Sequence, residues 1–256
     1  MRNQKINART RVATAAQKQI ANIAARTARE RRELPTSSAT AVIPVAHSEP
    51  LIKENGPQIA QQTSLPALRE AVQCCRECDL YRHATQAVFG EGPRSSAIVF
   101  IGEQPGDEED RQGHPFVGPA GRLLDRALAE AGIDRSAVYL TNAVKHFKFE
   151  ERGKRRIHKK PSQVETRICR PWLENELSLI KPAILVCLGA TAARSVFGKD
   201  YRLTEARGQF VPHAWAPQAT ATIHPAAILR APEDKRQIEY QWLVEDLKKV
   251  QAASIA

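Results

Sequence analysis

The chain has 256 residues, enough for one globular domain of ordinary size and additional segments. Hydrophobic residues make up 42% of it, and no stretch approaches the roughly 20 apolar residues of a membrane span, so we expect no membrane anchor. The formal charge of +10 favours a polyanionic partner such as nucleic acid, and the lack of an apolar stretch behind Met1 argues against secretion and favours the cytoplasm.

The first quarter of the chain differs in composition from the rest. Residues 1–34 contain nine Lys or Arg residues against Glu30 and Glu33, so this tail carries +7 of the net charge. It is either a solvated basic arm or a segment that contacts phosphates without sequence preference. Residues 35–65 are rich in Pro, Ser, Thr, Ala and Gln and predict a linker, and residues 66–252 are predicted to form the globular domain.

Within this domain, short β-rich runs alternate with amphipathic helices. The candidate strands are residues 97–101, 138–141, 183–188 and 219–223. Continuous apolar strands separated by helices are typical of parallel sheets that are covered on both faces. The pattern therefore predicts an α/β fold with a central, mainly parallel, four-stranded sheet flanked by helices.

Three helices have clear sequence signals. One begins near Pro119, carries leucines on one face and ends at Gly132. Another begins with the capping box Ser162–Glu165, and Pro171 predicts an irregularity inside it. The last spans about 232–250. Its residues expected to pack in the core are Ile238, Trp242 and Leu247.

Each candidate strand is followed by polar or glycine-rich residues. The first is followed by Gly102, Glu103, Gln104 and Asp107, the second by Asn142, the third by Gly189, and the fourth by His224. Ligands of open α/β sheets bind beyond the carboxyl ends of the strands, so a carboxylate, an amide and an imidazole should converge there. Phe116, between two glycines, is a candidate for stacking on a flat ring, with packing in the core as the alternative.

Four ordered motifs carry a family resemblance. GEQPG, EDRQGHPFVGPAG, TNAVKH and HPAAILR, in this order and spacing, resemble the family 4 branch of the uracil-DNA glycosylase superfamily, over roughly residues 68–250. The resemblance implies the three-layer fold of that superfamily and a monomer acting on uracil-containing DNA. It implies that Phe116 stacks on an extruded uracil, Asn142 contacts its polar edge and His224 lies near the carbonyl that gains charge. Gly102 and Gln104 would line the pocket through their backbones. Asp107 and Asp110 would assist there or cap a helix.

The cysteines fit metal binding better than disulfides. There are five, an odd number without a signal peptide, and Cys75 and Cys78 form a Cys-x-x-Cys pair for which Cys74 is an alternative partner. The resemblance implies a [4Fe–4S] cluster, with Cys169 as a further ligand. Where the family has its remaining cysteine, this chain has His146, which can replace a thiolate on iron. Cys75, Cys78, His146 and Cys169 are therefore the expected set, with a degraded or absent cluster as the alternative. Cys187, within a strand, is expected to be buried.

A basic insertion follows the second strand. Seven of residues 147–161 are Lys or Arg, which predicts a solvated loop that contacts phosphates. His158 lies among them, where neighbouring cations disfavour its charged form and keep it nucleophilic. GEQPG together with KRRIHKKP resembles the UdgX type, a divergent relative of family 4 in which the loop histidine attacks the sugar. The residues that this resemblance assigns to the loop are Lys154, Arg155, Arg156, Ile157 and His158.

The sequence therefore predicts excision of uracil from DNA, preferably single-stranded DNA, followed by capture of deoxyribose C1′ by His158. Glu103 would accept a proton or support the developing cation. Two alternatives remain open at this point. One is a turnover glycosylase that releases an abasic site while His158 contacts phosphate. The other is an Fe–S module that binds DNA without breaking a bond.

Overall fold

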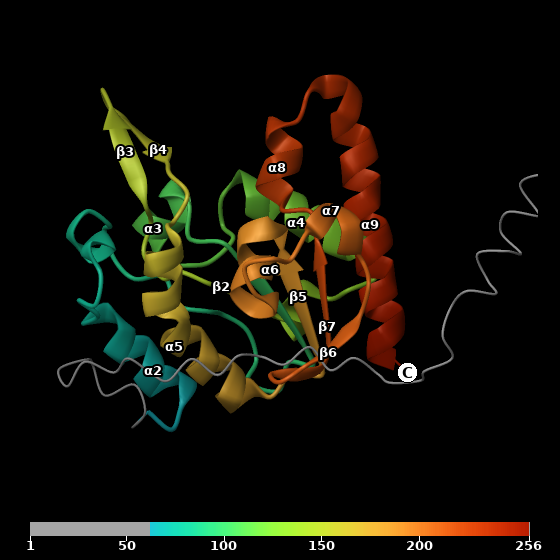
Figure 1. Cartoon of the computed structure of the whole chain (residues 1–256), viewed down its shortest axis with the longest axis horizontal. Coiled ribbons are helices and arrows are strands. Elements are labelled where there is room, and N and C mark those ends of the chain that lie inside the picture. Colours follow the sequence, from blue (N-terminus) through green and yellow to red (C-terminus); the bar gives the residue numbers. More distant parts are fainter. Residues whose placement is uncertain (1–61, 256) are drawn as a thin grey trace, which may run out of the picture. The chain divides into compact units, whose positions relative to one another are not determined.

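The computed structural model describes residues 62–255, and no helix in this range is long and apolar enough to cross a membrane. The predicted basic tail, 1–34, and all but the last four residues of the predicted linker, 35–65, lie outside the described residues. Figure 1 shows the described elements in chain order. They are α2 (Leu65–Gln73), η2 (Asp79–Arg82), β1 (Ile98–Gly102), α3 (Asp107–Gln112), α4 (Pro119–Glu130), η3 (Arg135–Ala137), β2 (Tyr139–Asn142), β3 (Phe149–Arg152), β4 (Arg155–His158), α5 (Gln163–Ile180), β5 (Ile184–Leu188), α6 (Gly189–Phe197), α7 (Leu203–Ala206), β6 (Val211–His213), β7 (Ala216–Thr222), α8 (Pro225–Arg230) and α9 (Glu233–Ile255).

The central sheet has the strand order β2-β1-β5-β7-β6. The first four strands pair in parallel, as the apolar runs predict, and the α/β fold class is confirmed. The expected number of four strands is wrong, because β6 pairs antiparallel with β7 at the edge of the sheet. This strand has only three residues, one of them a proline, and its first two residues are exposed. Its sequence therefore lacks the apolar run by which the other strands are recognised.

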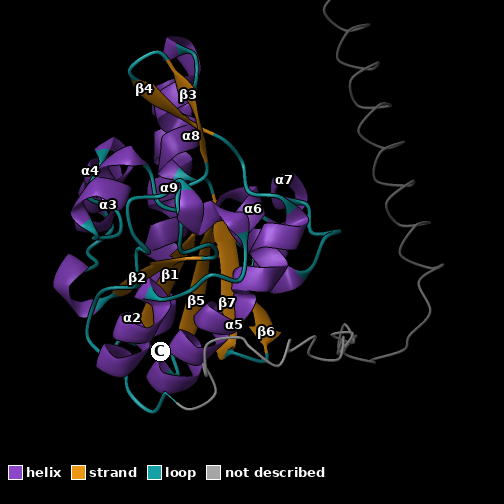
Figure 2. Ribbon diagram, turned by 90° about the vertical axis from the view of Figure 1, so that its left-hand side faces the viewer, coloured by secondary structure: helices purple, strands orange, loops and turns teal. Residues whose placement is uncertain are grey.

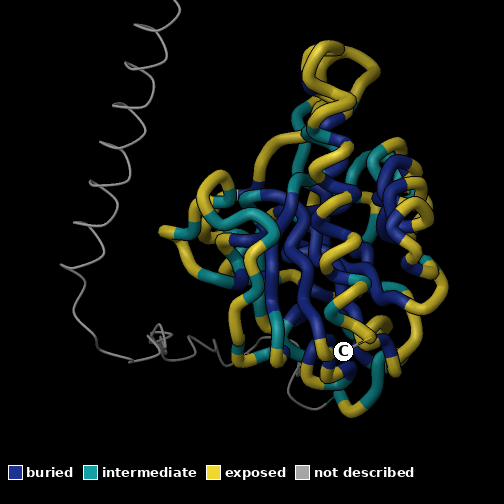
Figure 3. Tube along the Cα trace, turned by 90° about the vertical axis from the view of Figure 1, so that its right-hand side faces the viewer, coloured by how far each residue is buried: buried dark blue, intermediate teal, exposed yellow. Residues whose placement is uncertain are grey.

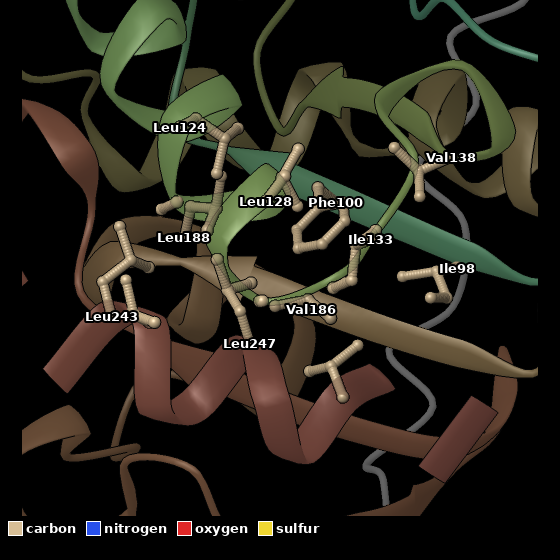
Figure 4. Close-up of a cluster of buried hydrophobic side chains, with 14 of the residues drawn as sticks. Ile98, Phe100, Leu124, Leu128, Ile133, Val138, Val186, Leu188, Leu243 and Leu247 are labelled. Carbon is tan, nitrogen blue, oxygen red and sulfur yellow. The ribbon is translucent and has the colours of Figure 1, made fainter. Parts of the chain in front are cut away.

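Helices cover both faces of the sheet, as Figure 2 shows with α4 on one side and α6 on the other. Strand residues alternate between the faces, so Phe100 packs toward α4, α8 and α9 while Ile101 packs toward α5 and α6. Figure 4 shows the first of these layers, in which Leu124 and Leu128 of α4 meet Leu243 and Leu247 of α9 over the strands. In Figure 3 the buried residues, dark blue, gather in the interior of the described residues, and the exposed ones lie at the periphery.

The helix signals in the sequence are largely confirmed. α4 begins at Pro119, and the chain turns at Gly132, whose φ of 77° is in the left-handed region. Ser162 and Glu165 form the predicted capping box of α5. Pro171 lies inside α5, and the helix continues through it to Ile180.

The prediction of core packing in the last helix is wrong for two of its three residues. Leu247 is buried, but Ile238 and Trp242 are 53% and 42% exposed. Trp242 and Leu247 are five residues apart, which turns the helix by about 140° beyond a full turn, so the two cannot share one face. The buried face of α9 instead carries Tyr240, Leu243 and Val244 together with Leu247.

The basic insertion forms a β-hairpin, where the sequence predicts only a loop. β3 and β4 pair antiparallel, with Arg152 opposite Arg155. Gly153 and Lys154 make the two-residue turn, and Gly153 has the positive φ (60°) that tight hairpin turns require. Figure 1 shows this hairpin and α8 at the same end of the sheet.

Candidate active site

A cavity of about 370 Å³ opens at the carboxyl ends of the parallel strands. Glu103 and Gln104 line it from the turn after β1, Asn142 from the end of β2, and His224 from the start of α8. Phe116 and His158 also line it, although neither belongs to the central sheet; the hairpin carries His158 to the wall. Parallel strands end at a common edge, and that edge gathers these side chains. Of the residues predicted to contact the base, Gly102 and Asp107 do not line the cavity.

Gly102 matters for the cavity because it has no side chain. A Cβ atom at this position would lie 2.3 Å from Asn142 Oδ1 and 2.7 Å from Phe116 Cζ. Both distances are far below van der Waals contact, so only glycine lets the amide and the aromatic ring approach each other here. Gly102 therefore shapes the cavity from behind its lining residues.

Phe116 is held in an uncommon backbone conformation. Its φ of 58° lies in the left-handed region, which a bulky residue rarely adopts. The N-terminus of α4 packs against its carbonyl group so closely that a Cβ atom at Gly121 would lie 1.7 Å from that oxygen. The ring is almost fully buried, and its centroid lies 6.3 Å from that of His224 with 28° between the planes. The surrounding backbone thus fixes one flat wall of the cavity.

Glu109 is a cavity residue that the sequence does not predict. Its buried carboxylate accepts the backbone N–H of Gly106 at 3.0 Å and that of Gly118 at 2.7 Å. These two bonds join the turn after β1 to the turn that carries Phe116. The only sequence signal is the position of Glu109 as the third residue of α3, where a glutamate commonly caps the helix.

The imidazole of His224 is held as a neutral hydrogen-bond donor. Nδ1 accepts the backbone N–H of Ala226 at 3.0 Å, so a neutral ring carries its hydrogen on Nε2. Burial, together with the charge of Arg230, lowers the pKa of His224 to about 4. Gly189, with a φ of 86°, permits this packing, because a Cβ there would lie 2.8 Å from His224 Cβ. At neutral pH this ring can donate from Nε2 without carrying a charge.

The side chain of Gln104 holds the base of the hairpin. Its Nε2 donates to the carbonyl oxygens of Lys148 at 3.1 Å and Lys159 at 3.0 Å, and its Oε1 accepts the N–H of Lys148 at 3.0 Å. Lys148 precedes β3 and Lys159 follows β4. The sequence predicts a backbone role for Gln104, whereas the structure adds a direct connection from its side chain to the segment that carries His158.

His158 faces a carboxylate in the cavity. Its Nε2 lies 3.4 Å from Glu103 Oε1. Although its side chain is 42% exposed, partial burial and the charge of Arg230 lower the pKa of His158, while Glu103 opposes this shift. The ring also packs against Phe147, with 6.1 Å between the centroids. The lowered pKa favours the neutral imidazole, and a carboxylate lies close to Nε2.

Arg156 makes ion pairs that the sequence does not predict. The sequence predicts a DNA contact, but the side chain is only 14% exposed and binds two carboxylates of α3. Nε donates to Asp107, and one terminal nitrogen donates to Asp110 at 2.6 Å. Asp107 and Asp110 therefore hold the hairpin against α3 and do not face the cavity. The hairpin residues Lys154 and Arg155 are exposed, as a phosphate contact requires.

Comparison with known proteins identifies the family. The Uracil DNA glycosylase superfamily model matches residues 89–248. The chain belongs to the uracil-DNA glycosylase superfamily. A Type-4 uracil-DNA glycosylase of Thermotoga maritima is 37% identical over 185 residues, which cover 72% of this chain and 91% of the relative. Type-4 uracil-DNA glycosylases of Sulfurisphaera tokodaii and Archaeoglobus fulgidus are each 34% identical, covering 75% and 73% of this chain and 86% and 92% of those relatives.

In this superfamily member, the predicted cluster ligands lie in or beside one hydrophobic cluster between α2 and α5. Cys75 and Cys169 are buried in it, and Cys78 packs against it. Each sulfur has an N–H donor nearby: Trp172 Nε1 lies 3.3 Å from Cys75, the N–H of Lys145 lies 3.2 Å from Cys169, and the N–H of Leu80 faces Cys78. Such donors stabilise the thiolates that hold iron–sulfur clusters.

His146 is buried, and in sequence it lies two residues after Val144, a member of the same cluster. Burial lowers its pKa to about 4, so it is neutral and able to bind a metal. Within residues 62–255, no three His, Cys, Asp or Glu side chains are arranged to hold a single metal ion. Cys187 is buried in β5, as predicted, and Cys74 is exposed.

Proposed function

We propose that this protein excises uracil from DNA and keeps the deoxyribose as a covalent adduct on His158, as the UdgX type does. One observation carries the proposal: the imidazole of His158 lines the same cavity as Phe116, Asn142 and His224, beside the carboxylate of Glu103. Family membership and the Type-4 relatives support uracil excision. The nucleophile beside the pocket supports capture.

Recognition of the base uses the side chains of Phe116 and Asn142. Uracil leaves the DNA stack at a cost of a few kcal/mol, which is smaller in a single strand, and we therefore expect single-stranded DNA to be preferred. Phe116 stacks on the extruded ring. Asn142 accepts from the ring N–H with Oδ1 and donates to a ring carbonyl with its amide nitrogen. Lys154 and Arg155 contact the flanking phosphates.

Cleavage separates the C1′–N1 bond with its electron pair going to uracil. The developing charge spreads to the O2 carbonyl, where the Nε2–H of neutral His224 donates a hydrogen bond. The sugar acquires oxocarbenium character at C1′, and the carboxylate of Glu103 stabilises this positive charge. The uracil anion takes up a proton from solvent and leaves as the neutral base.

Capture forms a bond between C1′ and His158. Nε2 transfers its proton to the Glu103 carboxylate, 3.4 Å away, and its freed lone pair attacks C1′, so the product is a neutral N-glycosyl imidazole. This group leaves poorly. Because His158 occupies the side of C1′ from which water would attack, the adduct persists and each molecule acts once.

We further propose that Cys75, Cys78, His146 and Cys169 hold a [4Fe–4S] cluster. The burial of three of these residues and the N–H donors at the sulfurs support this assignment. When bound, the cluster supplies a structural link between the segment after α2 and α5 and no step of the base excision. Iron and acid-labile sulfide measured in purified protein should be stoichiometric, and His146→Ala should lower both. Purified wild-type protein without iron would overturn the assignment.

Covalent capture is tested on a denaturing gel. The protein is incubated with a short single strand containing one uracil, and with the same strand containing thymine. A heat-stable band of protein plus DNA with the uracil strand alone supports the proposal. Abasic DNA without a shifted band would instead indicate a turnover glycosylase. An unchanged strand would indicate a module that only binds DNA.

The nucleophile is tested with His158→Ser. This variant should lose the adduct and gain release of uracil, because water can then reach C1′. Lys160→Ser, at another exposed position beyond the same hairpin, is the matched control and should retain the adduct. A His158→Ser protein that still forms the crosslink would exclude His158 as the attacking group.

A further inference from the structure

A fully buried ion pair lies beneath the candidate active site. Lys145 Nζ is 2.5 Å from Glu176 Oε2, and both side chains are wholly inaccessible to solvent. Burying two charges costs free energy that their attraction offsets only in good geometry, and apolar residues of similar volume often stabilise a core as well. Stability alone therefore does not explain the pair.

The ammonium group of Lys145 binds the residue that faces the base. Nζ donates to the backbone carbonyl of Asn142 at 2.9 Å and to Thr141 Oγ1 at 2.7 Å. With Glu176, these acceptors use all three ammonium protons. Asn142 ends β2, and its side chain lines the cavity. Lys145 thus fixes the peptide group of Asn142 just where the strand leaves the sheet.

Glu176 prevents the ammonium from moving. Besides Lys145, its carboxylate accepts the hydroxyl of Thr141 at 2.8 Å, the hydroxyl of Tyr139 at 3.2 Å and the N–H of Gly90 at 2.9 Å. The network connects β2 to α5 and to the segment before β1. Groups that contact a reacting substrate must be held to within about 0.5 Å, which needs supporting partners that are themselves fixed.

We propose that Lys145 is a positioning residue for the Asn142 amide, and that Glu176 holds Lys145 in place. The inference rests on the proposed uracil excision. Without Lys145, the backbone of Asn142 would no longer be held in place, and its side-chain amide could shift. A displacement of such a group by about 1 Å can lower the rate a hundredfold. Binding of DNA through the hairpin would remain.

The test separates positioning from stability. Lys145→Met leaves Glu176 unpaired and should melt at a lower temperature, whereas Lys145→Met/Glu176→Met removes both charges and should recover most of that loss. The double variant should nevertheless lose about tenfold or more in the single-turnover rate with uracil DNA at saturating protein, because Asn142 still lacks its donor. The protein concentration that gives half the maximal rate should stay within about twofold.

Two further variants distinguish positioning by Lys145 from general destabilisation of the network. Tyr139→Phe removes one hydrogen bond of Glu176 but no contact of Lys145, so its rate should match the wild type. Glu176→Gln should melt earlier yet keep most of the rate, because the amide oxygen of the glutamine can still accept from Lys145 and hold it against Asn142. A Glu176→Gln rate as low as that of Lys145→Met would show general destabilisation and overturn the inference.

A double-mutant cycle with Asn142→Ala gives the final test. If Lys145 acts through the Asn142 amide, Lys145→Met should cost much less in rate when the amide is already absent. Full additivity of the two effects would exclude positioning. If wild-type protein leaves uracil DNA unchanged, the proposed function itself fails, and this inference with it. If the wild-type protein excises uracil and a folded Lys145→Met/Glu176→Met variant does so at an equal rate, the positioning role is refuted while the proposed function stands.

Discussion

Replacement of Gln104 by methionine should loosen the attachment of the hairpin beside the active site. The substitution keeps the length of the side chain and removes its three hydrogen bonds to Lys148 and Lys159. Each such bond contributes about 1 kcal/mol net. One of the carbonyls, that of Lys148, also accepts the N–H of Lys159 at 2.9 Å, so its loss is partly compensated.

The expected loss is therefore about 2 kcal/mol, which corresponds to about 30-fold in the rate of adduct formation. Gln104→Glu should be slower still, because it retains the acceptor but directs a carboxylate oxygen at two carbonyl oxygens. The assay is quantification of the crosslinked band against time at saturating protein. Gln209→Met is the matched control. The side chain of this exposed glutamine, which follows α7, makes one hydrogen bond, to the backbone carbonyl of Glu205 in that helix.

Equal rates for wild type and both Gln104 variants would refute the reasoning, since the hairpin would then hold His158 in place without this side chain. A large fall in melting temperature with an unchanged rate would refute it as well, because it would assign Gln104 to overall stability. A fall in rate, with the modest fall in melting temperature that the lost hydrogen bonds predict, supports a role in placing the nucleophile.

Two other predictions follow from the same cavity. The rate of adduct formation should be constant at and above pH 7 and fall at lower pH with a midpoint below 6.5, since the pKa of His158 is lowered and only its neutral form attacks. Glu103→Gln removes the charge that raises this pKa, so its midpoint should shift further down; an upward shift contradicts the assignment. Gly102→Ala places a methyl group against Asn142 and Phe116, and should cost about a hundredfold in uracil release, measured as free base. An alanine variant with wild-type release would show that the Asn142 amide and the Phe116 ring can be displaced without loss of activity.

The fold follows largely from local sequence patterns. Apolar runs alternating with amphipathic helices predict the four parallel strands, because burial on both faces favours apolar residues at most positions of a strand. β6 escapes this rule since it lies at the edge, where its residues face solvent. Ile238 and Trp242 also depart from the pattern, because they are apolar residues that lie on the exposed side of α9.

The motifs at the strand ends determine much of the site. Asn142 and His224 can be placed there from sequence, because the carboxyl ends of parallel strands share an edge. The sequence also singles out His158 as the exceptional member of a basic segment. It cannot say where this segment lies, since a hairpin away from the sheet has no periodicity that relates it to the strand ends.

Tertiary structure alone decides what surrounds His158. Gln104 reaches hairpin residues 44 and 55 positions away in sequence, and Arg156 reaches Asp107 from 49 positions away. Hydrogen bonds between such distant segments depend on the relative placement of whole elements, which no local pattern encodes. The sequence by itself determined the parallel sheet, its polar edge and the candidate nucleophile. Only the folded chain brings that imidazole next to Glu103, because the bonds that hold the hairpin exist only once the sheet and α3 have formed.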